Sequence, residues 1–203
     1  MGYLIIIIGA YLLGSSNLAL CLFKWKKVDA RNNGSGNLGA SNATLLLGWG
    51  AGIAVAAHDI GKSLLAVILS RFVFHDLEYA GAAAGVACVL GHIFPFYLKF
   101  RGGKGFASYI GMIIALNWKF ALVVLILVGV VTLLTDYLVA GTTLTIVSSP
   151  IYLGWSHHNM IIALILCVAT AVIIYKHWDN YVRIWKGTEI GLRSAAKGEH
   201  RIK

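Results

Sequence analysis

After Met1 the chain reads GYLIIIIGAYLLGSSNLALCLF (residues 2–23), a long apolar run that the basic segment KWKKVDAR (residues 24–31) follows directly. A helix of about 20 apolar residues is long enough to cross the hydrocarbon core of a bilayer. Lysine and arginine gather on the cytoplasmic side of membrane helices, so we expect the carboxyl end of this run in the cytoplasm. The run therefore predicts a membrane protein whose amino terminus lies outside.

The composition of the whole chain also indicates a membrane protein. Of its 203 residues, 59% are hydrophobic and 12% are charged, and the mean hydropathy is +0.78. Soluble domains are about 45–50% apolar and about 25% charged, so a soluble protein of this composition would expose large apolar patches. The formal net charge of +9 indicates membrane orientation or attraction to phosphate, and we expect no nucleic-acid partner. We predict a single integral membrane domain over residues 1–203.

Six more apolar runs follow the first, so the predicted fold is all-α, a polytopic membrane protein with seven transmembrane helices. The later runs cover residues 45–74, 80–97, 106–116, 120–135, 137–155 and 160–175. The first of these six is longer than one span needs, which leaves room for a break, and the third is short for a crossing. With seven crossings the carboxyl terminus is cytoplasmic, and 14 of the 17 lysine and arginine residues lie on that side.

Three polar stretches fall on the predicted cytoplasmic side, and the first is RNNGSGNLGASN (residues 31–42). Glycine allows backbone N–H groups to turn toward an anion, and adjacent amides in such a turn can form an anion-binding nest. Serine and asparagine side chains add hydrogen-bonding groups. A flexible loop between two helices is the alternative interpretation. The residues expected to bind phosphate are Gly34, Ser35, Gly36, Asn37 and Asn42.

The second polar stretch is KFRGGKG (residues 99–105), which is basic and rich in glycine. Its Lys104 supplies a cation, and Gly102 and Gly103 supply flexible backbone beside it. A nucleotide-binding P-loop is excluded, because Gly105 follows the lysine where that motif needs serine or threonine. The stretch is instead expected to hold a phosphate group without a nucleotide.

The third polar stretch is HWDNYVR (residues 177–183), and Glu189 follows it closely. Its residues His177, Asn180 and Arg183 are three apart, so on a helix they line one face. Side chains of these types donate hydrogen bonds to phosphate oxygens. We therefore expect this face to contribute to the same phosphate chemistry as the two glycine-rich stretches.

A few ionisable residues lie inside the apolar runs. Asp59 and Lys62 are three apart and share a helical face, and such groups at membrane depth usually face a polar interior. We interpret them as a structural pair. His92, shortly before Pro95, is either a core histidine bonded to a backbone carbonyl or a substrate contact. No obvious histidine–aspartate pair for acid–base catalysis is visible, and no cysteine has metal-ligand spacing, so we expect neither a metal nor a cofactor.

The polar stretches closely resemble those of the bacterial acyl-phosphate:glycerol-3-phosphate acyltransferases. The matching motifs are Gly34-Ser35-Gly36-Asn37-x-Gly39-Ala40-x-Asn42, Gly91-His92-x-Phe94-Pro95 with Gly102-Gly103-Lys104-Gly105, and His177-x-x-Asn180-x-x-Arg183-x-x-x-Gly187-x-Glu189. The resemblance implies a seven-helix enzyme of the bacterial inner membrane with its active site facing the cytoplasm. It would transfer a fatty acyl group from acyl phosphate to the 1-hydroxyl of glycerol 3-phosphate, forming lysophosphatidate within the membrane lipid.

The resemblance also implies roles for individual residues. The expected catalytic residues are Lys104, Ser35, His177 and Asn180. The expected substrate-binding residues are Gly34, Gly36, Asn37, Asn42, Gly102, Gly103, Thr142, Arg183 and Glu189. Members of the family are thought to need no protein general base, because the phosphate of the substrate takes the proton. An acyl phosphate is a mixed anhydride with a good leaving group, so the enzyme mainly positions two phosphates and offsets their charge.

Two positions depart from the family pattern. The family usually has arginine, a phosphate ligand, where this chain has Leu45, and serine where it has Thr142. Threonine keeps the hydroxyl, but leucine keeps nothing that binds phosphate. We expect Arg31 or Arg101 to supply the missing cation. The alternatives are a slow enzyme, an acyltransferase with another polyol acceptor, or a non-catalytic transporter of organic phosphates, and the oligomeric state is not predicted.

Overall fold

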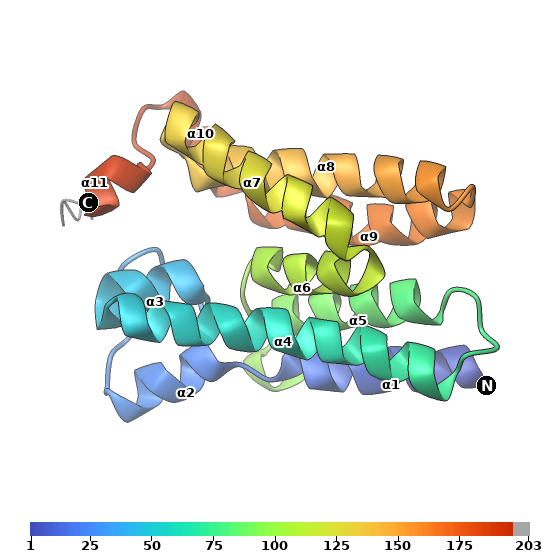
Figure 1. The fold of residues 1–203 in the computed structure, drawn as a ribbon. Helices are drawn as coiled ribbons and strands as arrows, with labels where there is room; N and C mark the ends of the chain where they lie inside the picture. Colours follow the sequence, from blue (N-terminus) through green and yellow to red (C-terminus); the bar gives the residue numbers. More distant parts are fainter. Residues whose placement is uncertain (197–203) are drawn as a thin grey trace. The chain divides into compact units, whose positions relative to one another are not determined.

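The computed structural model describes residues 1–196, and every regular element in that range is a helix. The all-α prediction is therefore confirmed for the described chain. The predicted basic tail extends beyond it, and Lys197, Arg201 and Lys203 lie outside the described residues. The chain divides into two compact units, Met1–Leu116 and Asn117–Lys203, which are treated one after the other (Figure 1).

The first apolar run forms two helices, α1 (Gly2–Ser15) and α2 (Leu18–Trp25). The break falls at Asn17, whose backbone is extended and whose side chain accepts a hydrogen bond from the backbone N–H of Leu20 at 2.8 Å. An asparagine in this position satisfies one of the unpaired N–H groups at the start of a helix. Its amide nitrogen also donates to the carbonyl of Leu38 at 3.3 Å, which ties the break to the first polar stretch.

The second apolar run is likewise divided, into α3 (Ala40–Leu47) and α4 (Trp49–Val73). Gly48 separates them with a φ of 89°, a left-handed conformation that glycine adopts without a steric penalty. The long α4 then runs through the membrane-spanning region and carries Asp59 and Lys62 on its buried side. The break for which the sequence left room therefore lies at a glycine.

Helices α5 (Ala80–Ile93) and α6 (Phe106–Leu116) complete the first unit, with the short 3-10 helix η1 (Phe96–Leu98) between them. Glycines make the helix contacts close. A side chain at Gly91 would collide with the backbone of Tyr11 on α1, and one at Gly111 would collide with the backbone of Ile60 on α4. Small residues of this kind allow membrane helices to pack backbone against backbone.

The second unit is built from antiparallel neighbours, in which α8 packs against both α7 and α9 (Figure 1). Its helices are α7 (Trp118–Thr135), α8 (Leu138–Ser156), α9 (Met160–Lys176), α10 (Trp178–Trp185) and the short α11 (Leu192–Ala196). The chain bends by 47° between α9 and α10, at His177. The bend turns α10 away from the direction of the spanning helix.

Within the described chain, five helical segments are long and apolar enough to span a bilayer, and a sixth results if α9 and α10 form one bent span. The side chains of Ile126 and Leu134 on α7 are 66% and 78% exposed, as expected where lipid is the solvent. The multi-pass membrane architecture is therefore confirmed. The helix α6 has 11 residues. At about 1.5 Å per residue it extends roughly 16 Å, against roughly 30 Å of hydrocarbon.

Candidate active site

The first polar stretch is organised around the side chain of Asn42, which is completely buried. Its carbonyl oxygen accepts the backbone N–H of Ser35 at 2.8 Å, and its amide nitrogen donates to the carbonyls of Asn37 at 2.9 Å and Ala30 at 3.1 Å. Both ends of the amide are thus engaged by the loop. The contacts of Asn42 hold the loop in one conformation, while its predicted contact with substrate remains a prediction.

Two glycines give this loop its shape. Gly34 and Gly36 have φ values of 62° and 69°, in the left-handed region that other residues rarely adopt. A Cβ at Gly34 would also overlap the amide oxygen of Asn42. Because Asn42 occupies the backbone N–H of Ser35, the hydroxyl is the donor that Ser35 can turn toward a ligand.

The start of the same stretch is ionic. The Asp29 carboxylate accepts from the side chain of Asn32 at 2.6 Å and the backbone N–H of Arg31 at 3.0 Å, and these bonds hold the pKa of Asp29 below its usual value. The guanidinium of Arg31 donates to the backbone carbonyl of Arg101, which joins the first polar stretch to the second. Partial burial and the nearby charge of Arg101 lower the pKa of Arg31. Two cations therefore stand together at this end of the first unit.

The second polar stretch is fastened to the end of α5 by its own glycines. The backbone N–H of Gly102 donates to the carbonyl of Ile93 at 2.9 Å, and that of Gly103 donates to the carbonyl of His92 at 3.1 Å. A Cβ at Gly102 would overlap the His92 carbonyl, and a Cβ at Gly103 would overlap the His92 ring. These two N–H groups thus support the fold, and the loop delivers Lys104 directly before the first turn of α6.

A buried ionisable cluster lies behind this loop. It contains the predicted pair of Asp59 and Lys62, which is confirmed, and it adds His92, which the sequence did not connect to them. The Lys62 ammonium lies 2.8 Å from the Asp59 carboxylate and 2.9 Å from Nδ1 of His92. The His92 Nδ1 is also 3.3 Å from the same carboxylate oxygen. The sequence showed no obvious histidine–aspartate pair for acid–base catalysis, and it gave no sign of this buried contact, in which α4 and α5 bring together residues 33 positions apart. His92 is a core histidine, but its ring bonds to side chains rather than to a backbone carbonyl.

In the second unit the residues of the third polar stretch are held by Glu189. Its carboxylate accepts from the side-chain amide of Asn180 at 2.5 Å and from Nε of Arg183 at 2.6 Å. The ring of His177 is fixed separately, with Nδ1 located 2.9 Å from the carbonyl of Ile173. The sequence correctly predicted that these residues share a helical region, whereas the bridging position of Glu189 became visible only in the structure.

Thr142 lies on the first turns of α8, at the end of the second unit where α9 gives way to α10. Its side chain is buried, and its hydroxyl donates to the carbonyl of Leu138 at 3.1 Å. The neighbouring Thr143 hydroxyl bonds to the Tyr181 hydroxyl at 2.8 Å, which fastens α8 to α10. The second unit therefore gathers its predicted site residues at one end, as the first unit gathers Ser35 and Lys104.

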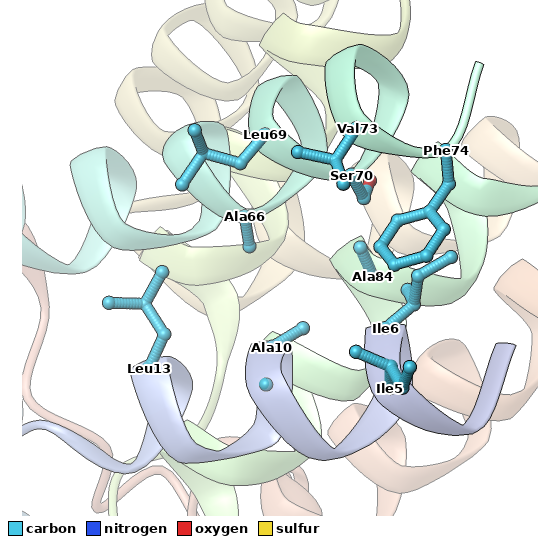
Figure 2. A pocket seen from close by; sticks show the side chains of 11 residues that line it. Ile5, Ile6, Ala10, Leu13, Ala66, Leu69, Ser70, Val73, Phe74 and Ala84 are labelled. Carbon is cyan, nitrogen blue, oxygen red and sulfur yellow. The ribbon is translucent and has the colours of Figure 1, made fainter. Parts of the chain in front are cut away.

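An apolar cavity of about 280 Å³ lies elsewhere in the first unit, between α1, α4 and α5. Figure 2 shows its lining, which includes Ile6, Phe74 and Ala84. The lining comes from α1, the last part of α4 and, with Ala84, from α5, whereas the polar loops follow α2 and η1. The only hydroxyl in the lining, that of Ser70, already donates to the backbone of Val67 at 2.9 Å. The cavity therefore offers no group suited to phosphate chemistry.

Comparison with known proteins identifies the family. Residues 4–187 match the family model described as glycerol-3-phosphate acyltransferase. This chain belongs to the glycerol-3-phosphate acyltransferase family. It is 38% identical over 193 residues to the glycerol-3-phosphate acyltransferase of Coxiella burnetii (strain CbuG_Q212), covering 93% of this chain and 97% of the relative. The relative from Thermoanaerobacter pseudethanolicus is 34% identical, with 89% of this chain and 90% of that protein covered.

Two solved structures of this acyltransferase family have the same fold. One is the glycerol 3-phosphate form of PlsY (YgiH), an integral membrane glycerol 3-phosphate acyltransferase, with a TM-score of 0.90, 31% identity and coverage of 97% of this chain and 98% of that chain. The other is the lysophosphatidic acid form, with a TM-score of 0.84, 30% identity and coverage of 94% and 95%. The family resemblance drawn from the three polar stretches is confirmed.

Proposed function

We propose that this protein transfers a fatty acyl group from acyl phosphate to the 1-hydroxyl of glycerol 3-phosphate. The observation that carries the proposal is the near-complete match to glycerol-3-phosphate acyltransferases, whose matched range, residues 4–187, contains all three polar stretches. The reaction breaks the bond between the acyl carbon and the phosphate oxygen and forms an ester bond to the glycerol oxygen. The hydroxyl proton leaves with inorganic phosphate, and lysophosphatidate is the other product.

For this reaction the protein has to position the two substrates and offset their charge, and it does not have to supply a strong acid or base. Acyl phosphate already carries a good leaving group, while two phosphates that approach each other repel. In the first unit Lys104 supplies an ammonium and Ser35 a hydroxyl from loops that internal hydrogen bonds hold in place. Cations fixed in advance stabilise the charge that grows on the leaving phosphate.

In the second unit we assign His177 and Asn180 to contact with the reactants, and Arg183 to a phosphate. Glu189 acts through the other two residues, because its carboxylate already accepts from Asn180 and Arg183. A carboxylate held between two donors fixes their orientation and stops Arg183 from turning toward the lipid headgroups. Thr142 keeps the hydroxyl that the family usually provides with serine.

For the acceptor we favour glycerol 3-phosphate itself, although Leu45 replaces a family arginine. The contact between Arg31 and the Arg101 backbone supports this choice, because it keeps two guanidinium groups at the loop end of the first unit. Either can offset the second phosphate charge. A less anionic polyol would not need them.

We propose seven crossings, with the amino terminus outside and the three polar stretches in the cytoplasm of a bacterial cell, at its inner membrane. The asymmetry of lysine and arginine supports this orientation. In this arrangement α6 is a shortened crossing. Single cysteines at Ser35, Lys104 and Arg183, in a variant without the three native cysteines, should resist a membrane-impermeant thiol reagent in intact cells and react after permeabilisation. Labelling of any of them in intact cells would overturn the orientation.

The enzymatic proposal is tested with purified protein in nanodiscs, palmitoyl phosphate and radiolabelled glycerol 3-phosphate. We expect labelled lysophosphatidate and one equivalent of inorganic phosphate, and no product when palmitoyl coenzyme A replaces palmitoyl phosphate. Unlabelled glycerol and other polyols serve as competing acceptors and should not reduce the label incorporated. Phosphate-ester flux across vesicles without lysophosphatidate would instead identify a transporter.

A further inference from the structure

The cluster of Asp59, Lys62 and His92 has no part in the chemistry described so far. All three side chains are buried, with 2%, 5% and 3% of each residue exposed. Charged groups at this depth of a membrane protein are costly to keep, and they usually mark a functional site. One neighbour of the cluster is partly exposed: the His58 ring lies 3.3 Å from the Asp59 carboxylate, and its side chain is 29% exposed.

The hydrogen bonds of Lys62 determine where the proton of His92 lies. An ammonium donates through three N–H groups and cannot accept a hydrogen bond. The three acceptors around Lys62 are the Asp59 carboxylate at 2.8 Å, the Ser16 carbonyl at 2.8 Å and Nδ1 of His92 at 2.9 Å. A proton on Nδ1 would lie against an N–H group of Lys62 and would have the Asp59 oxygen, 3.3 Å away, as its acceptor, whereas a lone pair on Nδ1 accepts the shorter bond of 2.9 Å from Lys62. His92 is therefore neutral, with its proton on Nε2.

The Nε2–H group of His92 faces the loop that carries Lys104. A Cβ built on Gly103 would meet Nε2 before any other atom of the ring, so the imidazole fills the space that a side chain at that position would take. The backbone N–H of Gly103 also donates to the His92 carbonyl at 3.1 Å, which holds the loop in a fixed position beside the ring. Glycine at position 103 thus allows a buried N–H group to reach the inner side of the loop.

We propose that His92 is a further phosphate-binding residue, and that Lys62 and Asp59 position it. Its Nε2–H donates to an oxygen of the terminal phosphate group held at the Gly102–Gly103–Lys104 loop. Lys62 fixes the tautomer, and Asp59 neutralises and orients the ammonium. This assignment rests on the proposed acyltransferase function. The shared chemistry is a terminal phosphate group, which the acyl donor carries as a mixed anhydride and glycerol 3-phosphate carries as an ester, and the experiments distinguish between them.

Two substitutions separate phosphate binding from a purely structural role. The amide nitrogen of glutamine reaches about as far as Nε2, whereas the amide of asparagine reaches only about as far as Nδ1. His92→Gln should therefore keep KM for both substrates within about threefold of the original. His92→Asn, which can still accept from Lys62, should raise one KM by about 10- to 100-fold, as expected for a lost hydrogen bond to a charged group.

The substrate whose KM rises identifies the phosphate that His92 contacts, and either result supports the proposal. An unchanged KM for both substrates in His92→Asn would overturn the proposal. Full activity of His92→Asn together with a loss of activity in His92→Gln would also overturn it, because that result would show that only the bond to Lys62 matters. Size-exclusion profiles of the two variants in detergent control for folding. If the unaltered protein makes no lysophosphatidate, the acyltransferase proposal fails, and the following test still applies to His92.

The tautomer can be measured without activity. In 15N-histidine NMR of the protein in nanodiscs, His92 should show an unprotonated Nδ1 and a protonated Nε2, assigned by the signals that vanish in His92→Gln. Titration with inorganic phosphate should shift the Nε2 signal. In Lys62→Met the two tautomers should mix. A proton on Nδ1 in the original protein, or an Nε2 signal that saturating phosphate leaves unmoved, would rule out the assignment.

Discussion

His92 and His177 each stand at the end of a membrane helix, directly before a polar segment, yet their rings are held in opposite ways. In the first unit, Nδ1 of His92 lies 2.9 Å from the Lys62 ammonium and accepts a hydrogen bond from it, since this contact is shorter than the 3.3 Å to the Asp59 oxygen. In the second unit, Nδ1 of His177 faces the Ile173 carbonyl at 2.9 Å and must donate one. A carbonyl only accepts and an ammonium only donates, so the neighbour decides the tautomer.

The difference gives the two histidines different uses. His92 presents an N–H group at Nε2, which suits a phosphate oxygen. His177 in its neutral form presents a lone pair at Nε2, which suits a hydroxyl group such as that of a polyol acceptor. In the roles proposed above, two residues of one type serve opposite hydrogen-bonding needs, because one ring is held by a backbone carbonyl and the other by a buried charge.

The largest effect is expected from Lys104→Ala, which removes the cation that the first unit's loop delivers. The product-forming rate should fall by about 1,000-fold or more, because Arg31 and Arg101 are assigned to the other phosphate and do not replace the charge that stabilises the transition state. The matched control is Lys99→Ala, an exposed lysine of the same polar stretch, which should change the rate by less than about twofold. Comparable losses in both variants would mean that the loop attracts phosphate only by its total charge.

The next largest effect should come from Gly103→Ala, which tests directly whether the position of the His92 ring matters. The added methyl group overlaps the imidazole, so either the loop or the ring must move. Misplacement of a catalytic group by about 1 Å costs about 100-fold in kcat/KM. The control is Gly61→Ala on α4, where a methyl group would have no neighbour within 4 Å. Activity of Gly103→Ala at the level of this control would show that the ring and loop do not work together.

A smaller effect is expected from Glu189→Gln, which tests the His177 side. Glutamine can accept from Asn180 or Arg183 but lacks the charge that makes both bonds strong. Because the Arg183 side chain is 41% exposed, solvent screens its interaction with the carboxylate and makes the loss of that charge less costly. The kcat/KM for glycerol 3-phosphate should therefore fall by about 10- to 30-fold. Asp179→Asn, an exposed change on the same helix, should leave it within about twofold. An equal fall in both would point to general destabilisation of α10.

Much of this architecture can be predicted from the sequence because apolar length and basic flanks depend on local composition alone. The seven expected runs correspond to described helices, with ends that differ by a few residues. The division of the first run into two helices at Asn17 was not predicted. A single polar residue within an apolar run does not by itself indicate a helix start, and the capping bond to Leu20 is visible only in the structure. The sequence left room for a break within the run 45–74 but did not place it at Gly48.

Candidate site residues could be named where their motifs are contiguous, but contacts between residues of different helices could not be predicted. The pairing of Asp59 with His92 depends on how α4 packs against α5, which no spacing reveals. Asn42 was read as a phosphate donor from its residue type, although its bonds to Ser35 and Asn37 exhaust both ends of its amide. The distribution of hydrogen bonds in a loop is a property of the folded chain.

The smallest effect concerns Leu45, which takes the place of a family arginine. It lies on α3, partly buried and three residues after Asn42, at the same end as the contact between Arg31 and Arg101. If those arginines already supply the cation, Leu45→Arg adds charge to an occupied site, and KM for glycerol 3-phosphate should stay the same or rise by about twofold. Leu45→Met, of similar size and no charge, is the control. A fall of about tenfold or more in Leu45→Arg alone would show that the site lacks a cation, since one charged hydrogen bond has about that effect. The acceptor would then have to be sought among less anionic polyols.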